Sequence, residues 1–311
     1  MTGELVARLL KGDKLALSRV LSLVENGLPE GREAMKSLFS HTGRAHIVGV
    51  TGPAGSGKST LVGALARELR GRDRTVAIIA VDPTSPFSRG AVLGDRIRMQ
   101  ELTGDPGVFI RSMATRGALG GLAPTTNDLA TVLDAAGKDV VIIETVGAGQ
   151  DEVEVAGTAH TTIVISVPGS GDEVQAIKAG ILEIADILVV NKADQPRAEL
   201  TAKQLHVFMD LGRNVGWDVP ILKTVAIKGD GVKDLADAIE RHREYLQSSG
   251  RLEEARRQRA RRQLLALAQE EMLSRVLATA EGNGRLEELV EAIAKRELDP
   301  QTAAERLIAA D

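Results

Sequence analysis

Continuous apolar runs alternate with segments of helical periodicity through the middle of the chain. Val76–Val81 and Val140–Ile143, for example, are apolar at every position. Such runs are typical of strands in a parallel sheet that is covered on both faces. The pattern predicts an α/β fold with a mostly parallel, doubly wound sheet, and it places strands at residues 46–51, 75–81, 108–111, 139–144, 161–167, 186–190 and 220–224.

The two ends of the chain have a purely helical pattern. Leucine and valine recur at helical spacing before residue 45, and again after Ser248-Ser249-Gly250. A cluster of arginines at 251–262 opens the tail, and it is either a solvated helix face or a docking surface for an anionic ligand or partner protein. We expect a helical segment that caps the main domain, the main domain itself and a helical arm, at residues 1–45, 46–247 and 248–311.

Composition narrows the classes of function. Hydrophobic residues make up 43% of the 311 residues and aromatic residues only 2%, so the core is aliphatic. A net charge of −4 with one Trp and one Tyr argues against nucleic-acid binding. The chain has no Cys, which excludes disulfides and thiolate metal sites. We see no signal peptide and no apolar run near 18 residues, so we expect a cytoplasmic protein without a membrane partner.

A glycine-rich segment follows the first apolar run of the main domain. Its pattern is Gly, four residues, Gly, Lys, Ser, and leucines at helical spacing come after it. In the order strand, loop and helix, such a segment points its backbone N–H groups at phosphate oxygens. We expect it to bind a nucleoside triphosphate, with Lys58 at the β- and γ-phosphates and the Ser59 hydroxyl on Mg²⁺. The nucleotide-binding candidates here are Gly52, Ala54, Gly55, Ser56, Gly57, Lys58, Ser59 and Thr60.

A second motif indicates which base is bound. Asn191-Lys192-Ala193-Asp194 follows an apolar run and matches the Asn-Lys-x-Asp pattern of GTP-binding proteins. A carboxylate accepts from both the ring N1–H and the exocyclic amine of guanine, and adenine lacks this donor pair. Asp194 is therefore expected to select guanine, Asn191 to brace the loops and the Lys192 stem to lie on the base. Val225 and Ala226 lie where such proteins often carry Ser-Ala, and a backbone N–H there is expected to contact the guanine oxygen.

Acidic residues follow two other predicted strands. Glu144 and Gly147 stand where small GTPases have Asp-x-x-Gly, so Glu144 is expected to hold Mg²⁺ through a water and the Gly147 N–H to sense the γ-phosphate. Asp82 and Asp95 bound a polar loop that can reorder around Mg²⁺ and nucleotide, although either aspartate could instead cap a helix. The metal candidates are Ser59, Asp82, Asp95 and Glu144, and the catalytic candidates are Lys58, Asp95 and Glu144.

These motifs and the stretches between them resemble the MeaB/ArgK/MMAA family, which belongs to the SIMIBI class of P-loop GTPases. The similarity runs from about Val48 to Asp194 and is mostly a shared helical layout outside that span. The stretches that carry it are Val81–Pro83, Leu93–Asp95, Arg111–Gly117, Leu119–Ala123, Glu144–Gln150 and Pro168–Gln175.

The resemblance implies a GTPase metallochaperone that gates adenosylcobalamin delivery to a methylmalonyl-CoA-mutase-type enzyme and protects it. It implies a homodimer joined by the C-terminal arm, and Mg²⁺ and GTP or GDP as ligands. It also implies a switch that faces the partner, with the candidates Gln150, Asp172, Glu173, Gln175 and Lys178. Lys178 matches a family lysine that moves towards the nucleotide, although its position alone is also that of a solvated helix start.

Two other functions remain open at this point. A metal-insertion GTPase of the nickel-chaperone type needs Cys or His ligands, and this chain has no Cys and five scattered His. An ArgK-type kinase or ATPase linked to amino-acid transport would use ATP, which the Asp194 motif disfavours. The identity of a client mutase cannot be read from the chain.

Overall fold

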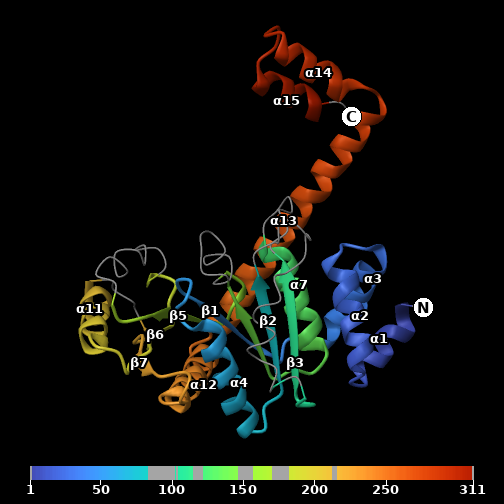
Figure 1. Ribbon diagram of the computed structural model, residues 1–311. Coiled ribbons are helices and arrows are strands. Elements are labelled where there is room, and N and C mark those ends of the chain that lie inside the picture. Colours follow the sequence, from blue (N-terminus) through green and yellow to red (C-terminus); the bar gives the residue numbers. More distant parts are fainter. Residues whose placement is uncertain are drawn as a thin grey trace. The chain divides into compact units, whose positions relative to one another are not determined.

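A single parallel sheet forms the centre of the protein. The computed structural model describes residues 2–82, 102, 104–114, 122–145, 157–169, 182–211 and 216–309. Seven strands of this part pair in the order β3-β2-β4-β1-β5-β6-β7, and every pair is parallel (Figure 1). The strands are β1 (His46–Thr51), β2 (Val76–Asp82), β3 (Val108–Ala114), β4 (Val140–Glu144), β5 (Thr161–Ser166), β6 (Ile187–Asn191) and β7 (Ile221–Thr224). The predicted doubly wound α/β fold is confirmed.

Successive side chains of the central strands point to opposite faces of the sheet, and each face has its own hydrophobic core. This explains why the sequences of these strands are continuously apolar. Ile78 and Ile142 pack on one face of the sheet, while Ile79 and Ile143 pack on the other. The first face is covered by α4 (Lys58–Gly71) and α12 (Val232–Ser248), and the second by α7 (Leu122–Ala135) and the N-terminal helices (Figure 1). A third cluster lies between β6 and α11 (Ala198–Leu211).

The N-terminal segment packs directly on the sheet. It contains α1 (Thr2–Leu10), α2 (Lys14–Glu25), α3 (Pro29–Leu38) and a short 3₁₀ helix, Phe39–His41. Its buried leucines and valines belong to the same core as Ile79 and the α7 leucines. These helices and the sheet are one compact unit, Met1–Ala255.

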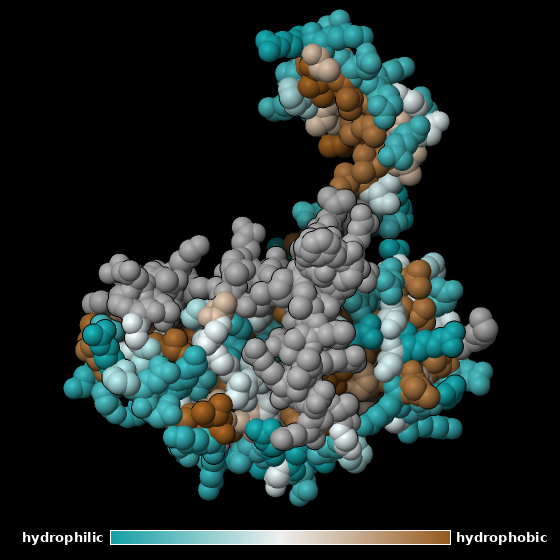
Figure 2. Space-filling model, viewed as in Figure 1, coloured by the Kyte–Doolittle hydropathy of each residue, from teal (hydrophilic) through white to brown (hydrophobic). Residues whose placement is uncertain are grey.

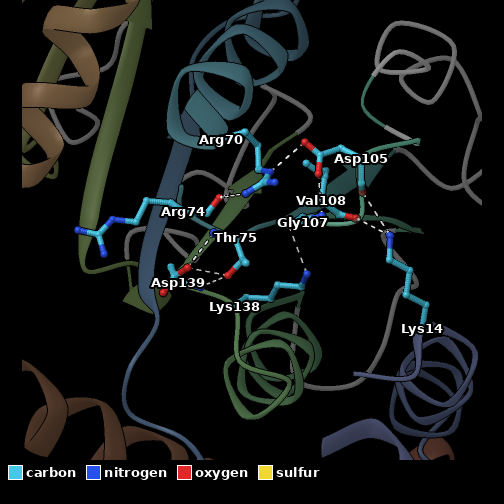
Figure 3. A network of polar contacts seen from close by, with 9 residues as sticks. All are labelled: Lys14, Arg70, Arg74, Thr75, Asp105, Gly107, Val108, Lys138 and Asp139. Atoms are coloured by element: carbon cyan, nitrogen blue, oxygen red, sulfur yellow. Dashed lines mark hydrogen bonds and ion pairs between the residues drawn. The ribbon is translucent and has the colours of Figure 1, made fainter. Parts of the chain in front are cut away.

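Polar contacts at the amino-terminal ends of β2, β3 and β4 fix the turn that leads into β3 (Figure 3). The Asp105 carboxylate accepts from Arg70 Nε at 2.9 Å and from the Gly107 N–H at 2.7 Å. The Arg70 guanidinium and the Gly107 N–H hold the pKa of Asp105 below its usual value. Lys14 donates to the Asp105 carbonyl at 3.3 Å and Lys138 to the Gly107 carbonyl at 3.4 Å. Lys14 and Lys138 thus donate to backbone carbonyls. Through Lys14 and Arg70, these contacts connect α2 and α4 to the turn before β3 and so to the sheet.

Residues 256–311 form a second compact unit. It contains most of α13 (Arg251–Gly282), followed by α14 (Arg285–Ala294) and α15 (Pro300–Ile308). Gly284 has φ +73° and separates α13 from α14, at the break that the sequence indicates. The division between the units falls within α13, after Ala255, whereas the sequence suggested residue 248. No helix of the described residues is long and apolar enough to cross a membrane.

Candidate functional site

The glycine-rich segment forms a tight loop between the end of β1 and the start of α4. Gly52 and Gly57 have φ of 144° and 87°, a region that other residues rarely adopt. A Cβ at Gly57 would lie 2.6 Å from Asn191 Nδ2, and one at Gly52 would meet the Ile165 carbonyl. Both glycines are therefore required by the backbone, and their loop is held against the carboxyl ends of β5 and β6, where ligands of parallel sheets bind.

Lys58 is held inside this loop. Only 7% of its surface is exposed, and its Nζ donates to the Gly52 carbonyl at 2.8 Å and to the Pro53 carbonyl at 3.0 Å. The chain thus places a buried positive charge beside the N-terminus of α4, whose partial charge has the same sign. The arrangement suits a polyphosphate.

Ser59 and Glu144 bring two oxygen donors together. Ser59 Oγ donates to Glu144 Oε1 at 2.6 Å, and both side chains are buried. Glu144 ends β4, next to β1, where Val50 is its register partner. Hydroxyl and carboxylate oxygens suit Mg²⁺, which is usually bound by one or two carboxylates together with substrate phosphates. Among the described residues no three His, Asp or Glu gather as a metal site. Ser59 and Glu144 therefore fit a Mg²⁺ that is shared with a bound nucleotide.

The remaining candidates around the γ-phosphate are described only in part. Asp82 ends β2, and the register of β2 with β4 places it near the carboxyl end of Glu144's strand. Other predicted residues lie outside the described residues, and they are Asp95, Gly147, Gln150, Asp172, Glu173, Gln175 and Lys178.

Asn191 joins the phosphate loop to the loop after β7. Its Nδ2 donates to the Ser56 carbonyl at 2.8 Å. Its Oδ1 accepts from Thr224 Oγ1 at 3.0 Å and from the Ala226 N–H at 3.2 Å. The side chain is almost fully buried, so these three bonds form in a site where unpaired polar groups are costly. Asn191 has the bracing position that its motif indicates.

Lys192 and Asp194 lie at the surface beside this brace. Lys192 has φ +56°, and its Nζ donates to the Gly55 carbonyl at 2.8 Å. The Asp194 carboxylate faces Lys228 Nζ at 3.4 Å and is 39% exposed. It is therefore accessible to a ligand that approaches from solvent. The contact with Lys228 has no signal in the sequence, because it joins two loops that the motif does not relate.

The backbone N–H groups after β7 are already engaged. The Val225 N–H donates to the Asp230 carbonyl at 3.0 Å, as part of an isolated antiparallel bridge. The Ala226 N–H has the longer bond to Asn191 described above. Both N–H groups of Val225 and Ala226 therefore have partners within the protein, and a backbone contact from this pair to the guanine oxygen stays a prediction.

Two threonine hydroxyls beside Glu144 were not identified from the sequence. Thr145 Oγ1 lies 3.1 Å from Thr51 Oγ1, and the Thr145 N–H donates to the Val50 carbonyl at 3.1 Å. Both threonines are buried. They extend the pairing of β1 and β4 by one residue and so fix the backbone at Glu144.

Known proteins are similar to this chain over most of its length. A family model described as methylmalonyl Co-A mutase-associated GTPase MeaB matches residues 17–281. A protein of Pyrococcus abyssi that is named as a GTPase is 48% identical over 99% of this chain and 96% of its own length. GTPase ArgK of Escherichia coli is 33% identical over 98% of this chain and 95% of its own.

A solved structure is similar over the same range. The crystal structure of an LAO/AO transport system kinase has a TM-score of 0.74 and 28% sequence identity, and the match covers 98% of this chain and 96% of that one. The motifs, the parallel sheet and the nucleotide-type loop all lie within the matched residues. The chain belongs to the MeaB/ArgK/MMAA family of P-loop GTPases, and it is a GTPase.

Proposed function

We propose that this GTPase is a chaperone for an adenosylcobalamin-dependent mutase of the methylmalonyl-CoA mutase type. In this role it gates cofactor delivery to the mutase and protects the loaded enzyme. The observation that carries the proposal is the match of the mutase-associated family model to residues 17–281. The geometry around Lys58, Ser59, Glu144 and Asn191 supports the nucleotide-dependent part of it.

In the proposed site, GTP lies across the carboxyl ends of the strands. Lys58 and the loop N–H groups bind the β- and γ-phosphates, Asp194 pairs with guanine, and Ser59 and Glu144 hold Mg²⁺ with contributions from Asp82 and Asp95. When bound, Mg²⁺ offsets the charge that develops on the transferred phosphoryl group. The Gly147 N–H reports the presence of the γ-phosphate to the switch.

The proposed switch depends on the client. Gln150 lies three residues beyond Gly147, whereas the water-positioning Gln of Ras-type GTPases follows the glycine directly. We therefore propose slow hydrolysis by the isolated protein. A client accelerates it if the client binds the GTP-loaded form of the protein better than the GDP-loaded form, with residues 82–95 and 172–178 as the proposed switch segments.

The test compares steady-state GTP turnover with and without a purified adenosylcobalamin-dependent mutase. We expect slow turnover alone and faster turnover with the mutase, and Lys178→Ala should reduce the stimulated rate more than the basal rate. Lys36→Ala, at an exposed lysine of α3, is the matched control and should behave as wild type. A lone protein that turns over at about 10 s⁻¹, a typical enzyme rate, would contradict the switch.

A second readout addresses the chaperone role itself. Cobalamin transfer to the apo-mutase, followed by its visible absorbance, should depend on GTP hydrolysis and stop with a non-hydrolysable GTP analogue. Transfer at one rate under all nucleotide conditions would contradict gating while leaving the GTPase activity intact.

We further propose that the protein is a homodimer joined through residues 256–311. Figure 2 shows apolar side chains gathered on this unit. Large exposed apolar residues of α13 are Leu264, Leu265, Leu267, Met272 and Leu273. Exposed apolar surface of this extent on one helix is typical of an interaction site.

Light scattering after size exclusion tests the dimer. The wild type should have twice the 33.0 kDa chain mass. The double variant Leu264→Glu with Leu267→Glu should be monomeric, because it places charges in the apolar interface. Gln269→Glu on the same helix is the control and should remain dimeric. A monomeric wild type at micromolar concentration would contradict the proposal.

A further inference from the structure

A cavity of about 120 Å³ lies near the amino-terminal ends of β5 and β6, at the edge of the sheet opposite the nucleotide site. Asp186 immediately precedes β6 and lines this cavity together with residues of α12 and of the segment before β7. We call it the Asp186 cavity. The residues that matter for its chemistry are Glu183, Asp186, Trp217, His242, Tyr245 and Arg251.

Aromatic rings form much of its wall. The chain has one Trp and one Tyr, and both are here. The Trp217 ring lies 5.1 Å from the Tyr245 ring and 4.7 Å from the His242 ring. Arg251 Cζ lies 5.5 Å from the centre of the Tyr245 ring, in a cation–π contact. The wall therefore already accepts one guanidinium, as the negative faces of aromatic rings do.

The Asp186 carboxylate has acceptor capacity that the protein does not use. Its Oδ2 accepts from the Thr162 N–H at 2.8 Å, and its Oδ1 lies 3.4 Å from His242 Nε2. A carboxylate offers about four acceptor positions. Its side chain is 32% exposed and lines the cavity, and no lysine or arginine in the described part of the chain forms an ion pair with it.

His242 lies beside Asp186 but brings it no positive charge. Burial lowers the pKa of His242 to about 4, and burial with nearby Arg243 lowers that of His46 to about 3. Thr161 Oγ1 lies 2.9 Å from His242 Nδ1 and 2.7 Å from His46 Nε2. With both rings neutral, one pair of tautomers satisfies these contacts: His46 Nε2–H donates to Thr161 Oγ1, and the Thr161 hydroxyl donates to His242 Nδ1. The His242 Nε2–H then lies on the side of Asp186.

The charge of Asp186 is thus uncompensated. Burial raises its pKa to about 7, which is the response of a carboxylate that lacks a cation. When Asp186 is ionised, Glu183 and Asp186 carry two negative charges and Arg251 one positive charge, so the lining then has a net charge of −1. An anion is disfavoured there, and a cation would satisfy both the carboxylate and the rings.

We propose that the Asp186 cavity binds a small organic cation, a guanidinium or primary ammonium head group, which pairs with Asp186 and lies against Trp217 and Tyr245. The cavity is small, about 120 Å³, and partly open to solvent, which suits a head group rather than a large molecule. The head group belongs either to a free small molecule or to an arginine or lysine side chain of a protein. The site is separate from the proposed mutase function and does not depend on it.

Trp217 makes the proposal directly testable, because it is the chain's one Trp and its fluorescence reports on this cavity. The full-length protein is titrated with methylguanidinium chloride and with ethylammonium chloride at constant ionic strength, and NaCl is the control. We expect a saturable change with the organic cations only. Binding should be about tenfold tighter at pH 8 than at pH 6, because the ionised fraction of Asp186 rises by that factor across its pKa.

Asp186→Asn has nearly the same shape, and it should remove both the saturation and the pH dependence. Glu183→Gln is the matched control and should retain both, with at most a few-fold weaker binding. Thermal unfolding by circular dichroism confirms that each variant is folded, and calorimetric titration gives binding independently of fluorescence. A change that is linear in concentration, equal in NaCl or unaffected by Asp186→Asn would overturn the proposal.

Two further titrants distinguish the sources of the head group. Argininamide represents a free small cation, and a capped Gly-Arg-Gly peptide represents a protein side chain. Binding of argininamide alone identifies a small-molecule site, and binding of the peptide with equal or higher affinity identifies a docking site for a protein arginine. Failure of both, together with the simple cations, would overturn the site while leaving the GTPase assignment untouched.

Discussion

GTP hydrolysis by Lys58→Ala is expected to fall by about 10²- to 10³-fold, the usual cost of removing one preorganised group that stabilises transition-state charge. Lys58 is a buried cation, and its Nζ is held at 2.8 Å from the Gly52 carbonyl, inside the phosphate loop. Its loss leaves the β- and γ-phosphate charge uncompensated. Single-turnover phosphate release at saturating GTP measures the effect on chemistry, and GDP affinity is measured separately.

A matched control comes from a second lysine that donates to the same phosphate loop. Lys192 donates to the Gly55 carbonyl at 2.8 Å but lies at the surface, so Lys192→Ala should lower the rate far less than Lys58→Ala. Because Lys58 also satisfies two carbonyls of the loop, thermal unfolding of each variant distinguishes a loosened loop from lost catalysis. Turnover of Lys58→Ala at the wild-type rate would show that the site is assigned wrongly.

The second large effect concerns the base. Asp194→Asn should weaken GTP binding by roughly 10³-fold, because an amide presents a donor where guanine needs two acceptors. The same variant should gain affinity for xanthosine triphosphate, whose C2 carbonyl replaces the guanine amine. Competition of GTP, ATP and xanthosine triphosphate against a fluorescent GDP analogue measures both changes.

Lys228→Ala is the control for this experiment. It removes the cation 3.4 Å from Asp194 while leaving the carboxylate, so it should keep the preference for guanine. If the wild-type protein binds ATP as tightly as GTP, Asp194 does not select the base, and the ATP-dependent kinase alternative gains support.

Most of the sheet could be predicted because its central strands are buried on both faces, and β2 and β4 are therefore apolar at almost every position. β3 shows the limit of this rule. The apolar pattern predicts residues 108–111, whereas the strand continues to Ala114 through Arg111 and Ser112. Arg111 is tolerated there because it forms an ion pair with Glu25 of α2, a contact between segments far apart in the sequence. The predicted strand therefore stopped at Arg111. The ion-pair partner that makes a polar residue acceptable there is far away in the sequence, so the local pattern could not reveal it.

The site could be predicted where a sequence motif always adopts the same local structure. Ser59 belongs to the phosphate-loop motif and Glu144 ends an apolar run, so both were expected near Mg²⁺. The position of Asn191 follows from the Asn-Lys-x-Asp motif. The engagement of the Val225 N–H by Asp230 was not predictable, because it depends on how a short loop closes.

The histidines at the amino-terminal ends of the strands are a second feature that the sequence could not predict. They are scattered in the sequence, yet His46 lies 5.4 Å from His160 between ring centres and is joined to His242 through Thr161. Strand register brings them together, since β1 and β5 are neighbours and α12 packs beside them. Nothing in the spacing of these residues along the chain indicates this.

The three hydrogen bonds of Asn191 have a consequence for nucleotide exchange. They join the loop that holds phosphate to the loop that follows β7, beside the groups that recognise the base. We therefore expect the two halves of the site to loosen together, because breaking the contacts of one loop removes hydrogen bonds that hold the other. Displacement of the 224–230 loop is thus expected to loosen the phosphate loop at Ser56 without any contact to the phosphates.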